Sequence, residues 1–373
     1  MLFKRSIQPR IEDHLFRGKV IIIYGPRRVG KTTLVQEIKK KFPEESSYLN
    51  CDEPDVRRAL TDKTSSELKS LIGKNKLVII DEAQRVLNIG LTLKLLVDNA
   101  PKLQVIATGS SSFDLSNKIK EPLTGRTYEF ILSPLSLAEI YPDQIETARL
   151  LETRMIYGSY PEIVSLGGQS AEETIKSIYK NYLYKDSLEY RQLKAPELLE
   201  KLLQALALQI GSEVHFTELA NLLEVDKETI SSYTRLLELA FVIFRLPPLS
   251  RNLRKEINKS RKIYFWDTGI RNAIINNFNP LALRSDTGAL WENFLITERF
   301  KRNGNLGLTP NTYFWRTWSK QEIDYIEESQ GTLNAFEIKW QKSRNSPPVT
   351  WRQTYPNSTW TPVTKENFSE FLT

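Results

Sequence analysis

Short apolar runs separated by amphipathic segments mark the first third of the chain. The runs at 20–23 and 77–80 are continuously apolar, as are strands buried on both faces of a sheet. Further strands are predicted at 48–51 and 103–108, and apolar residues at helical spacing follow the first run at 33–38. This alternation predicts an α/β fold with a doubly wound parallel sheet.

From residue 148 the pattern is helical, with a turn at 157–161. Further along, helices are predicted at 198–210, 216–223 and 229–240, and strands at 241–246 and 262–266. Two short helices followed by two strands predict a helix-turn-helix with a wing, and Thr217 and Asp226 are the expected N-caps. Such a module either contacts DNA or serves only for packing.

The last hundred residues return to mixed α/β patterning. A helix opens near 288, and strands are predicted at 313–315, 322–326 and 336–340. We therefore expect four parts: an α/β core at residues 1–145, a helical lid or linker at 146–195, a winged-helix-like domain at 196–270 and a second α/β domain at 271–373.

The most specific motif is GPRRVGKT at 25–32, which matches the phosphate-binding loop pattern G-x-x-x-x-G-K-[ST]. Its glycines let the backbone approach a polyphosphate, and the following helix N-terminus faces the anion. Lys31 is expected to reach the β- and γ-phosphates of ATP, and Thr32 to hold Mg²⁺ through its hydroxyl. The expected ATP contacts are Gly25, Pro26, Arg27, Arg28, Val29, Gly30, Lys31, Thr32 and Thr33.

Two acidic residues end the strand at 77–80, at the edge of the sheet where ligands bind in α/β folds. Asp81 is predicted to hold Mg²⁺ together with Thr32, and Glu82 to orient the attacking water as a general base. An acidic cap for the next helix is the alternative. In additional-strand ATPases a polar residue after the following strand senses the γ-phosphate, and Ser110 or Ser111 is the candidate, although serines also cap helices.

The motifs together resemble a widespread prokaryotic family of AAA-type ATPases that carry a C-terminal domain of unknown function. The resemblance covers nearly all of the chain and rests on GPRRVGKTTL, LVIIDEAQ, TGSSS, Gly125–Arg126 and the run SPLSL. It implies an AAA+-like core. It also implies that Arg126 is an arginine sensor or finger for the phosphates, with an ordinary ion pair as the alternative.

A second candidate site lies between residues 285 and 340. A glutamate on a helix, an aspartate on a strand and Glu-x-Lys on the next strand resemble the PD-(D/E)XK nuclease fold. Glu292, Asp324 and Glu337 would hold Mg²⁺ or Mn²⁺, and Lys339 would orient the attacking water. The chain departs from the fuller pattern because Ile323, not proline, precedes the aspartate. An amphipathic surface strand also produces Glu-x-Lys.

Composition limits the remaining function classes. The net charge of +7 and pI of about 9.2 permit DNA as a partner. A basic cluster at 251–262 would lie in the wing loop and could contact phosphates. One cysteine and two histidines exclude a disulfide framework and leave no material for a zinc site. No run approaches 18 apolar residues and the start lacks a signal-peptide core, so we expect a cytoplasmic protein without a membrane partner.

Two functions follow from these patterns. The first is a Mg²⁺-dependent ATPase coupled to a DNA-directed, metal-dependent nuclease module. The second is an ATP-switched DNA-binding or adaptor protein whose nuclease-like domain is an inactive scaffold. An oligomer is compatible with either function, and the sequence assigns none.

Overall fold

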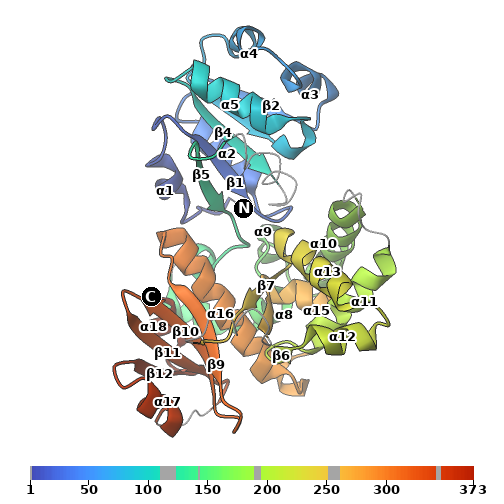
Figure 1. Cartoon of the computed structure of the whole chain (residues 1–373), viewed down its shortest axis with the longest axis vertical. Helices are drawn as coiled ribbons and strands as arrows, with labels where there is room; N and C mark the ends of the chain where they lie inside the picture. Colours follow the sequence, from blue (N-terminus) through green and yellow to red (C-terminus); the bar gives the residue numbers. More distant parts are fainter. Residues whose placement is uncertain (1, 110–122, 142, 189–194, 251–260, 342–345) are drawn as a thin grey trace. The chain divides into compact units, whose positions relative to one another are not determined.

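A computed structural model describes residues 2–109, 123–141, 143–188, 195–250, 261–341 and 346–373 (Figure 1). The chain forms two compact units. The first comprises residues 1–135 with 239–241, and the second comprises 136–238 with 242–373. Each unit is described by itself.

The first unit is a parallel α/β sheet. Its strands are β1 (Val20–Tyr24), β2 (Ser46–Asn50), β3 (Leu77–Asp81), β4 (Gln104–Gly109) and β5 (Thr127–Ile131). They pair in parallel in the order β2-β3-β4-β1-β5. Every residue of β1, β3 and β4 is buried, which explains their apolar runs. The predicted parallel α/β fold is confirmed.

Helices complete this unit (Figure 1). They are α1 (Gln8–Glu12), α2 (Lys31–Lys39), α3 (Pro54–Leu60), α4 (Ser65–Ile72) and α5 (Ile89–Asn99), with the 3-10 turn η1 (Ala83–Arg85). Because the strands are parallel, the carboxyl ends of β1, β3 and β4 meet at one edge of the sheet. The loop after β1 and the acidic end of β3 are therefore brought to the same edge.

The second unit begins with helices and contains two sheets. Its first elements are α7 (Leu137–Ile140), α8 (Gln144–Tyr157), α9 (Pro161–Val164), α10 (Gly168–Leu188) and α11 (Pro196–Leu208). Next come β6 (Glu213–Val214), α12 (Phe216–Leu222), α13 (Lys227–Leu239), β7 (Ile243–Leu246), β8 (Arg261–Phe265) and α15 (Thr268–Ile274). The three strands form an antiparallel sheet with β8 at its centre, in the order β6-β8-β7.

One of the two predicted helix caps is wrong. Helix α12 begins at Phe216, so Thr217 lies inside it, and the N-cap is His215, whose side chain makes no capping bond. Asp226 does cap the next helix, because its carboxylate accepts from the Thr229 backbone N–H at 2.6 Å. The predicted helix at 216–223 therefore begins at the correct residue, and only its N-cap was wrong.

The remaining elements form a mixed α/β layer. They are the turn η2 (Leu281–Leu283), α16 (Thr287–Leu306), β9 (Asn311–Arg316), β10 (Glu322–Ser329), β11 (Thr332–Ile338), α17 (Val349–Thr354), β12 (Thr359–Val363) and α18 (Phe368–Leu372). The sheet order is β12-β11-β10-β9, antiparallel except for the parallel pair β11–β12. The predicted mixed α/β domain is present.

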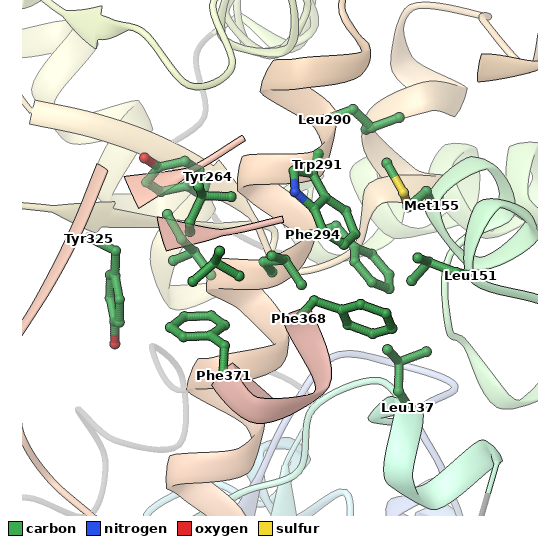
Figure 2. Packing of buried hydrophobic residues seen from close by; sticks show 14 of the residues in the cluster. Leu137, Leu151, Met155, Tyr264, Leu290, Trp291, Phe294, Tyr325, Phe368 and Phe371 are labelled. Atoms are coloured by element: carbon green, nitrogen blue, oxygen red, sulfur yellow. The ribbon is translucent and has the colours of Figure 1, made fainter. Parts of the chain in front are cut away.

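A large hydrophobic cluster connects several elements of the second unit (Figure 2). Helix α16 supplies Leu290, Trp291 and Phe294, which lie among side chains from α8, β8, β10 and α18. All three α16 side chains are buried. The cluster contains residues from segments that the sequence analysis assigned to different domains, so these segments share one hydrophobic core. The predicted four-part division stays a prediction.

The Gly–Ser–Tyr–Pro turn is explained by the buried carboxylate of Asp267. This carboxylate caps α15 by accepting from Ile270 N at 3.1 Å, and it also accepts from Ser159 N at 2.7 Å. Gly158 has φ +79°, and an added Cβ there would lie 2.0 Å from an Asp267 oxygen. The turn is therefore a packing contact in which only glycine leaves room for the carboxylate.

We expect Gly158→Ala to destabilise the chain by roughly 3 kcal/mol or more, because the methyl group must displace a buried carboxylate from its donors. Gly167→Ala is the matched control, since an added Cβ at Gly167 meets nothing within 4 Å. Chemical denaturation of both variants measures the difference. Equal midpoints would show that the turn tolerates a side chain.

Candidate functional site

The backbone geometry of the phosphate loop requires glycine at positions 25 and 30. Gly30, the N-cap of α2, has φ +95°, a left-handed conformation that favours glycine. At Gly25 an added Cβ would lie 2.1 Å from the carbonyl oxygen of Leu132. Both motif glycines are therefore required by the fold of the loop. The α2 N-terminus that follows them provides the backbone donors typical of anion sites.

Arg5 supports this loop from the N-terminal segment. Its guanidinium donates to the carbonyl oxygens of Val29 and Ser133, both at 2.7 Å, and its side chain is buried. One arginine thus joins the phosphate loop to the segment after β5. A planar guanidinium with several donors suits such a bridge between two backbone carbonyls.

Lys31 folds back onto its own loop. Its Nζ donates to the carbonyl oxygens of Gly25 at 2.8 Å and Pro26 at 2.9 Å, and the residue is buried. The ammonium therefore lies across the loop that is predicted to hold phosphates. Of the two loop arginines, Arg27 is half-buried, whereas Arg28 is exposed in a left-handed conformation.

Thr32 and Asp81 come into direct contact. The Thr32 hydroxyl donates to Asp81 Oδ2 at 2.7 Å, although the residues are far apart in sequence. Thr33, next to Thr32 on α2, is exposed. A hydroxyl and a carboxylate are oxygen donors of the kind Mg²⁺ prefers, so this pair fits the predicted metal position.

Two further hydroxyls hold the Asp81 carboxylate. Tyr48 of β2 donates to Oδ2 at 2.5 Å, and Thr108 of β4 donates to Oδ1. Burial and the Asp81 carboxylate raise the pKa of Tyr48, so its hydroxyl stays protonated and remains a donor. Three neighbouring elements thus fix the orientation of Asp81.

Glu82 lies directly after this network, in a left-handed conformation with φ +53°. Its backbone N–H donates to the Thr108 hydroxyl at 3.1 Å, and its carboxylate accepts from Gln84 Nε2 at 2.5 Å. Glu82 is only partly buried. Non-glycine residues in this conformation are uncommon and tend to cluster at functional sites. Here the conformation places the Glu82 carboxylate at the end of β3.

Arg126 lies at the amino ends of the parallel strands, opposite the carboxyl ends where the phosphate loop and Asp81 lie. Its carbonyl accepts from Val20 N at the start of β1, whereas the phosphate loop follows the end of that strand. A five-residue strand spans about 16 Å. The Arg126 guanidinium pairs with Asp98 at 2.8 Å, and both side chains are more than one-third exposed. The structure therefore does not bring Arg126 to this phosphate loop, and the ion-pair alternative describes its contacts. Ser110 and Ser111 lie outside the described residues.

The residues predicted for the second candidate site lie close together in the structure. Glu292 on α16, Asp324 on β10, Glu337 on β11 and Lys339 just after β11 meet in one cluster. Lys339 Nζ lies 2.9 Å from Asp324 Oδ2 and 3.4 Å from Glu337 Oε1. Asp324 also accepts from Ile338 N at 2.8 Å. It lies where the β9–β10 register shifts, a bulge-like irregularity of the kind that redirects a side chain.

A second lysine, Lys262, lies in this cluster. Its Nζ is 2.9 Å from Glu292 and 2.5 Å from Glu322, and 3.8 Å from Asp324. The side chain is 1% exposed, so the prediction that Lys262 contacts phosphates from a wing loop is wrong. Arg251, Arg254, Lys255 and Lys259 of that basic cluster lie outside the described residues.

Two lysines, Lys262 and Lys339, offset part of the negative charge of the four carboxylates in this cluster. Burial alone would lower the pKa of Lys262, but the surrounding carboxylates raise it well above its usual range. Burial raises the pKa of Glu292 to about 7, against the opposite effect of Lys262. Within the described ranges, no group of three or more acidic, histidine or cysteine side chains is arranged to hold a metal ion. The predicted metal set of Glu292, Asp324 and Glu337 does not fit, because the lysine ammonium lies among these carboxylates.

Sequence reasoning missed several residues that the structure brings into these sites. They are Arg5, Tyr48, Thr108, Tyr264 and Glu322. Thr108 had a signal, because it ends a buried strand beside the acidic one. The others gave none, since only tertiary packing brings them to their partners.

Three family models match consecutive parts of this chain. Residues 17–141 match the family model AAA_14, an AAA domain. This part of the chain is therefore similar to AAA domains, in agreement with the phosphate-loop motif at 25–32. Residues 148–281 and 287–350 match two domains of unknown function, DUF8612 and DUF4143. Among the residues that the structure covers, no helix is long and apolar enough to cross a membrane.

Several relatives share most of this chain. An uncharacterized protein of Mycobacterium tuberculosis is 28% identical over 343 residues, which are 91% of this chain and 74% of that protein. One from Methanocaldococcus jannaschii is 28% identical over 348 residues, covering 86% and 75%. One from Haemophilus influenzae is 22% identical over 352 residues, covering 87% and 83%. A Pif1 helicase structure from Candida albicans aligns with 48% of each chain at 12% identity and a TM-score of 0.26, which is too low to bear on the fold.

Proposed function

We propose that this chain hydrolyses ATP with Mg²⁺ and that its nucleotide state controls DNA binding by the second unit, whose nuclease-like sheet is a scaffold. The observation that carries the ATPase proposal is the 2.7 Å contact between Thr32 and Asp81 beside the phosphate loop. These are the two residue types that hold Mg²⁺ in P-loop enzymes, and they meet at the end of β3.

Each residue of the first site has a role in this proposal. Lys31 exchanges the carbonyls of Gly25 and Pro26 for phosphate oxygens when ATP binds, which keeps its ammonium hydrogen-bonded in both states. Thr32 and Asp81 hold Mg²⁺, which when bound supplies charge neutralisation for the β- and γ-phosphates. Glu82 orients the attacking water and accepts its proton.

DNA binding is proposed for the helices of the second unit. The order β6, α12, α13, β7, β8, with an antiparallel sheet, is that of a winged helix-turn-helix. Helix α13 exposes Lys227, Ser231 and Arg235, side chains of the kind that contact phosphates and base edges. The net charge of +7 favours a polyanionic partner.

We expect DNA affinity to differ between the ATP-bound and ADP-bound protein, measured by fluorescence anisotropy of a labelled duplex at fixed salt. Arg235→Ala should weaken binding in both states, because it removes a phosphate-directed charge. Lys339→Ala is the matched control and should leave binding unchanged. Equal affinity in the two nucleotide states would contradict the switch. The alternative, a metal nuclease, rests on the convergence of Asp324, Glu337 and Lys339. Plasmid cleavage in Mg²⁺ or Mn²⁺ that Lys339→Ala abolishes would contradict the scaffold.

A further inference from the structure

The ammonium of Lys262 lies beside Glu292 and Asp324, two of the three residues that the sequence predicted as metal ligands. Lys262 Nζ contacts Glu292 at 2.9 Å and Glu322 at 2.5 Å, with Asp324 at 3.8 Å. An ammonium has three donors and no acceptor, and here Glu292 and Glu322 lie within hydrogen-bond distance of it while Asp324 adds a nearby negative charge. The three carboxylates come from helix α16 and strand β10, and the cation comes from β8.

The fold fixes Lys262 in this position. Strand β8 is the central strand of its sheet, and Lys262 pairs with Glu213 of β6 on one side and Leu246 of β7 on the other. Tyr264, two residues further along the same strand face, donates its hydroxyl to Glu292 Oε1 at 2.6 Å. Pairing on both sides fixes the backbone of Lys262, and the side chain is 1% exposed, so the ammonium is held inside the cluster.

A divalent ion cannot share this cluster with Lys262. Mg²⁺ and Ca²⁺ need oxygen ligands at about 2.0–2.6 Å, and the carboxylates that could supply them are engaged by the ammonium. Two cations within a few ångströms in a buried setting also repel each other strongly. Lys339, on the other side of Asp324, adds a second positive charge.

We propose that Lys262 is a resident cation that replaces a divalent metal, and that a neutral side chain at this position converts the cluster into a divalent-metal site. The proposal concerns the second unit alone and does not depend on ATP hydrolysis or on DNA binding. The carboxylates then form a latent site, closed by one residue of the neighbouring sheet.

The test uses Mn²⁺ as the probe and electron paramagnetic resonance, because free Mn²⁺ gives a sharp signal that is lost on binding. The full chain without nucleotide is compared with Lys262→Met, which keeps the unbranched apolar stem but lacks the charge. Asp324→Asn is introduced into both backgrounds, so that binding at the phosphate loop is subtracted. ATP hydrolysis by each variant reports separately on the first unit.

We expect Lys262→Met to deplete the free Mn²⁺ signal, Asp324→Asn to reverse this depletion, and wild type to show no binding that depends on Asp324. Mn²⁺ should also raise the melting temperature of Lys262→Met and not that of wild type. Asp324-dependent binding in wild type would overturn the proposal, and so would a folded Lys262→Met that binds no Mn²⁺.

A folding failure is also informative. Removing Lys262 takes away the ammonium that buried Glu292 contacts, so Lys262→Met alone can unfold in metal-free buffer and should then refold when Mn²⁺ is added. The double variant Lys262→Met with Glu292→Gln removes one carboxylate charge and is expected to fold. Failure of both variants to fold in Mn²⁺ would count against the proposal, because a metal that fits the cluster must restore the lost charge.

Discussion

Replacing Lys31 with alanine is expected to lower ATP affinity roughly 10²- to 10⁴-fold. Two hydrogen bonds from its ammonium to phosphate oxygens are lost, and each bond to a charged group contributes about 1.5–3 kcal/mol. The fold should survive, because the Gly25 and Pro26 carbonyls released by the missing ammonium lie in a loop that can be solvated. Isothermal titration with a slowly hydrolysed ATP analogue measures the loss.

Lys40→Ala is the matched control for this experiment. Lys40, the C-cap of the same helix, is exposed, and its contact with Glu37 is a surface ion pair of the kind that contributes little. Unchanged affinity in Lys40→Ala alongside a large loss in Lys31→Ala would locate the effect at the loop. Equal affinity in both variants would mean that ATP binds without the Lys31 ammonium.

The parallel sheet was predictable because its central strands are buried on both faces. Strands of that kind are near-continuous apolar runs, so the segments 20–23 and 77–80 stand out in the sequence. The phosphate loop was predictable for a different reason, since its glycines and lysine are required by local geometry. The match of residues 17–141 to an AAA domain agrees with both features.

Lys262 illustrates what the sequence could not reveal. It follows a run of basic residues, and such a run usually forms a solvated face, so nothing local indicates that its ammonium is buried among carboxylates. Those carboxylates lie 30 or more residues away on α16 and β10. Whether a group of carboxylates can bind a metal depends on every charged side chain near it. The order of motifs predicted Glu292 and Asp324 but not the lysine that lies beside them.

Arg126 shows the same limit in the first unit. Family resemblance suggested an arginine directed at the phosphates, but a residue that precedes β5 must lie at the amino edge of a parallel sheet. The register Val20↔Thr127 fixes that position. Register is a property of strand pairing, which a motif at one position does not encode.

The Glu82→Gln variant is expected to bind ATP normally and to hydrolyse it roughly 10²- to 10⁴-fold more slowly, the usual contribution of a general base. The amide has the shape of the carboxylate but cannot accept a proton. The backbone N–H of residue 82 can still donate to the Thr108 hydroxyl, so the left-handed turn is retained. Phosphate release under saturating ATP measures the change.

Glu37→Gln, on helix α2 of the same unit, is the control for loss of a carboxylate charge alone and should keep wild-type turnover. Comparing the two variants separates the loss of charge from the loss of proton transfer. Both remove one negative charge from the first unit, but only Glu82→Gln removes it at the end of β3. If Glu82→Gln retains full turnover, the water is activated by another group. If it loses ATP binding as well, the carboxylate helps to hold the nucleotide, and the base assignment must be abandoned.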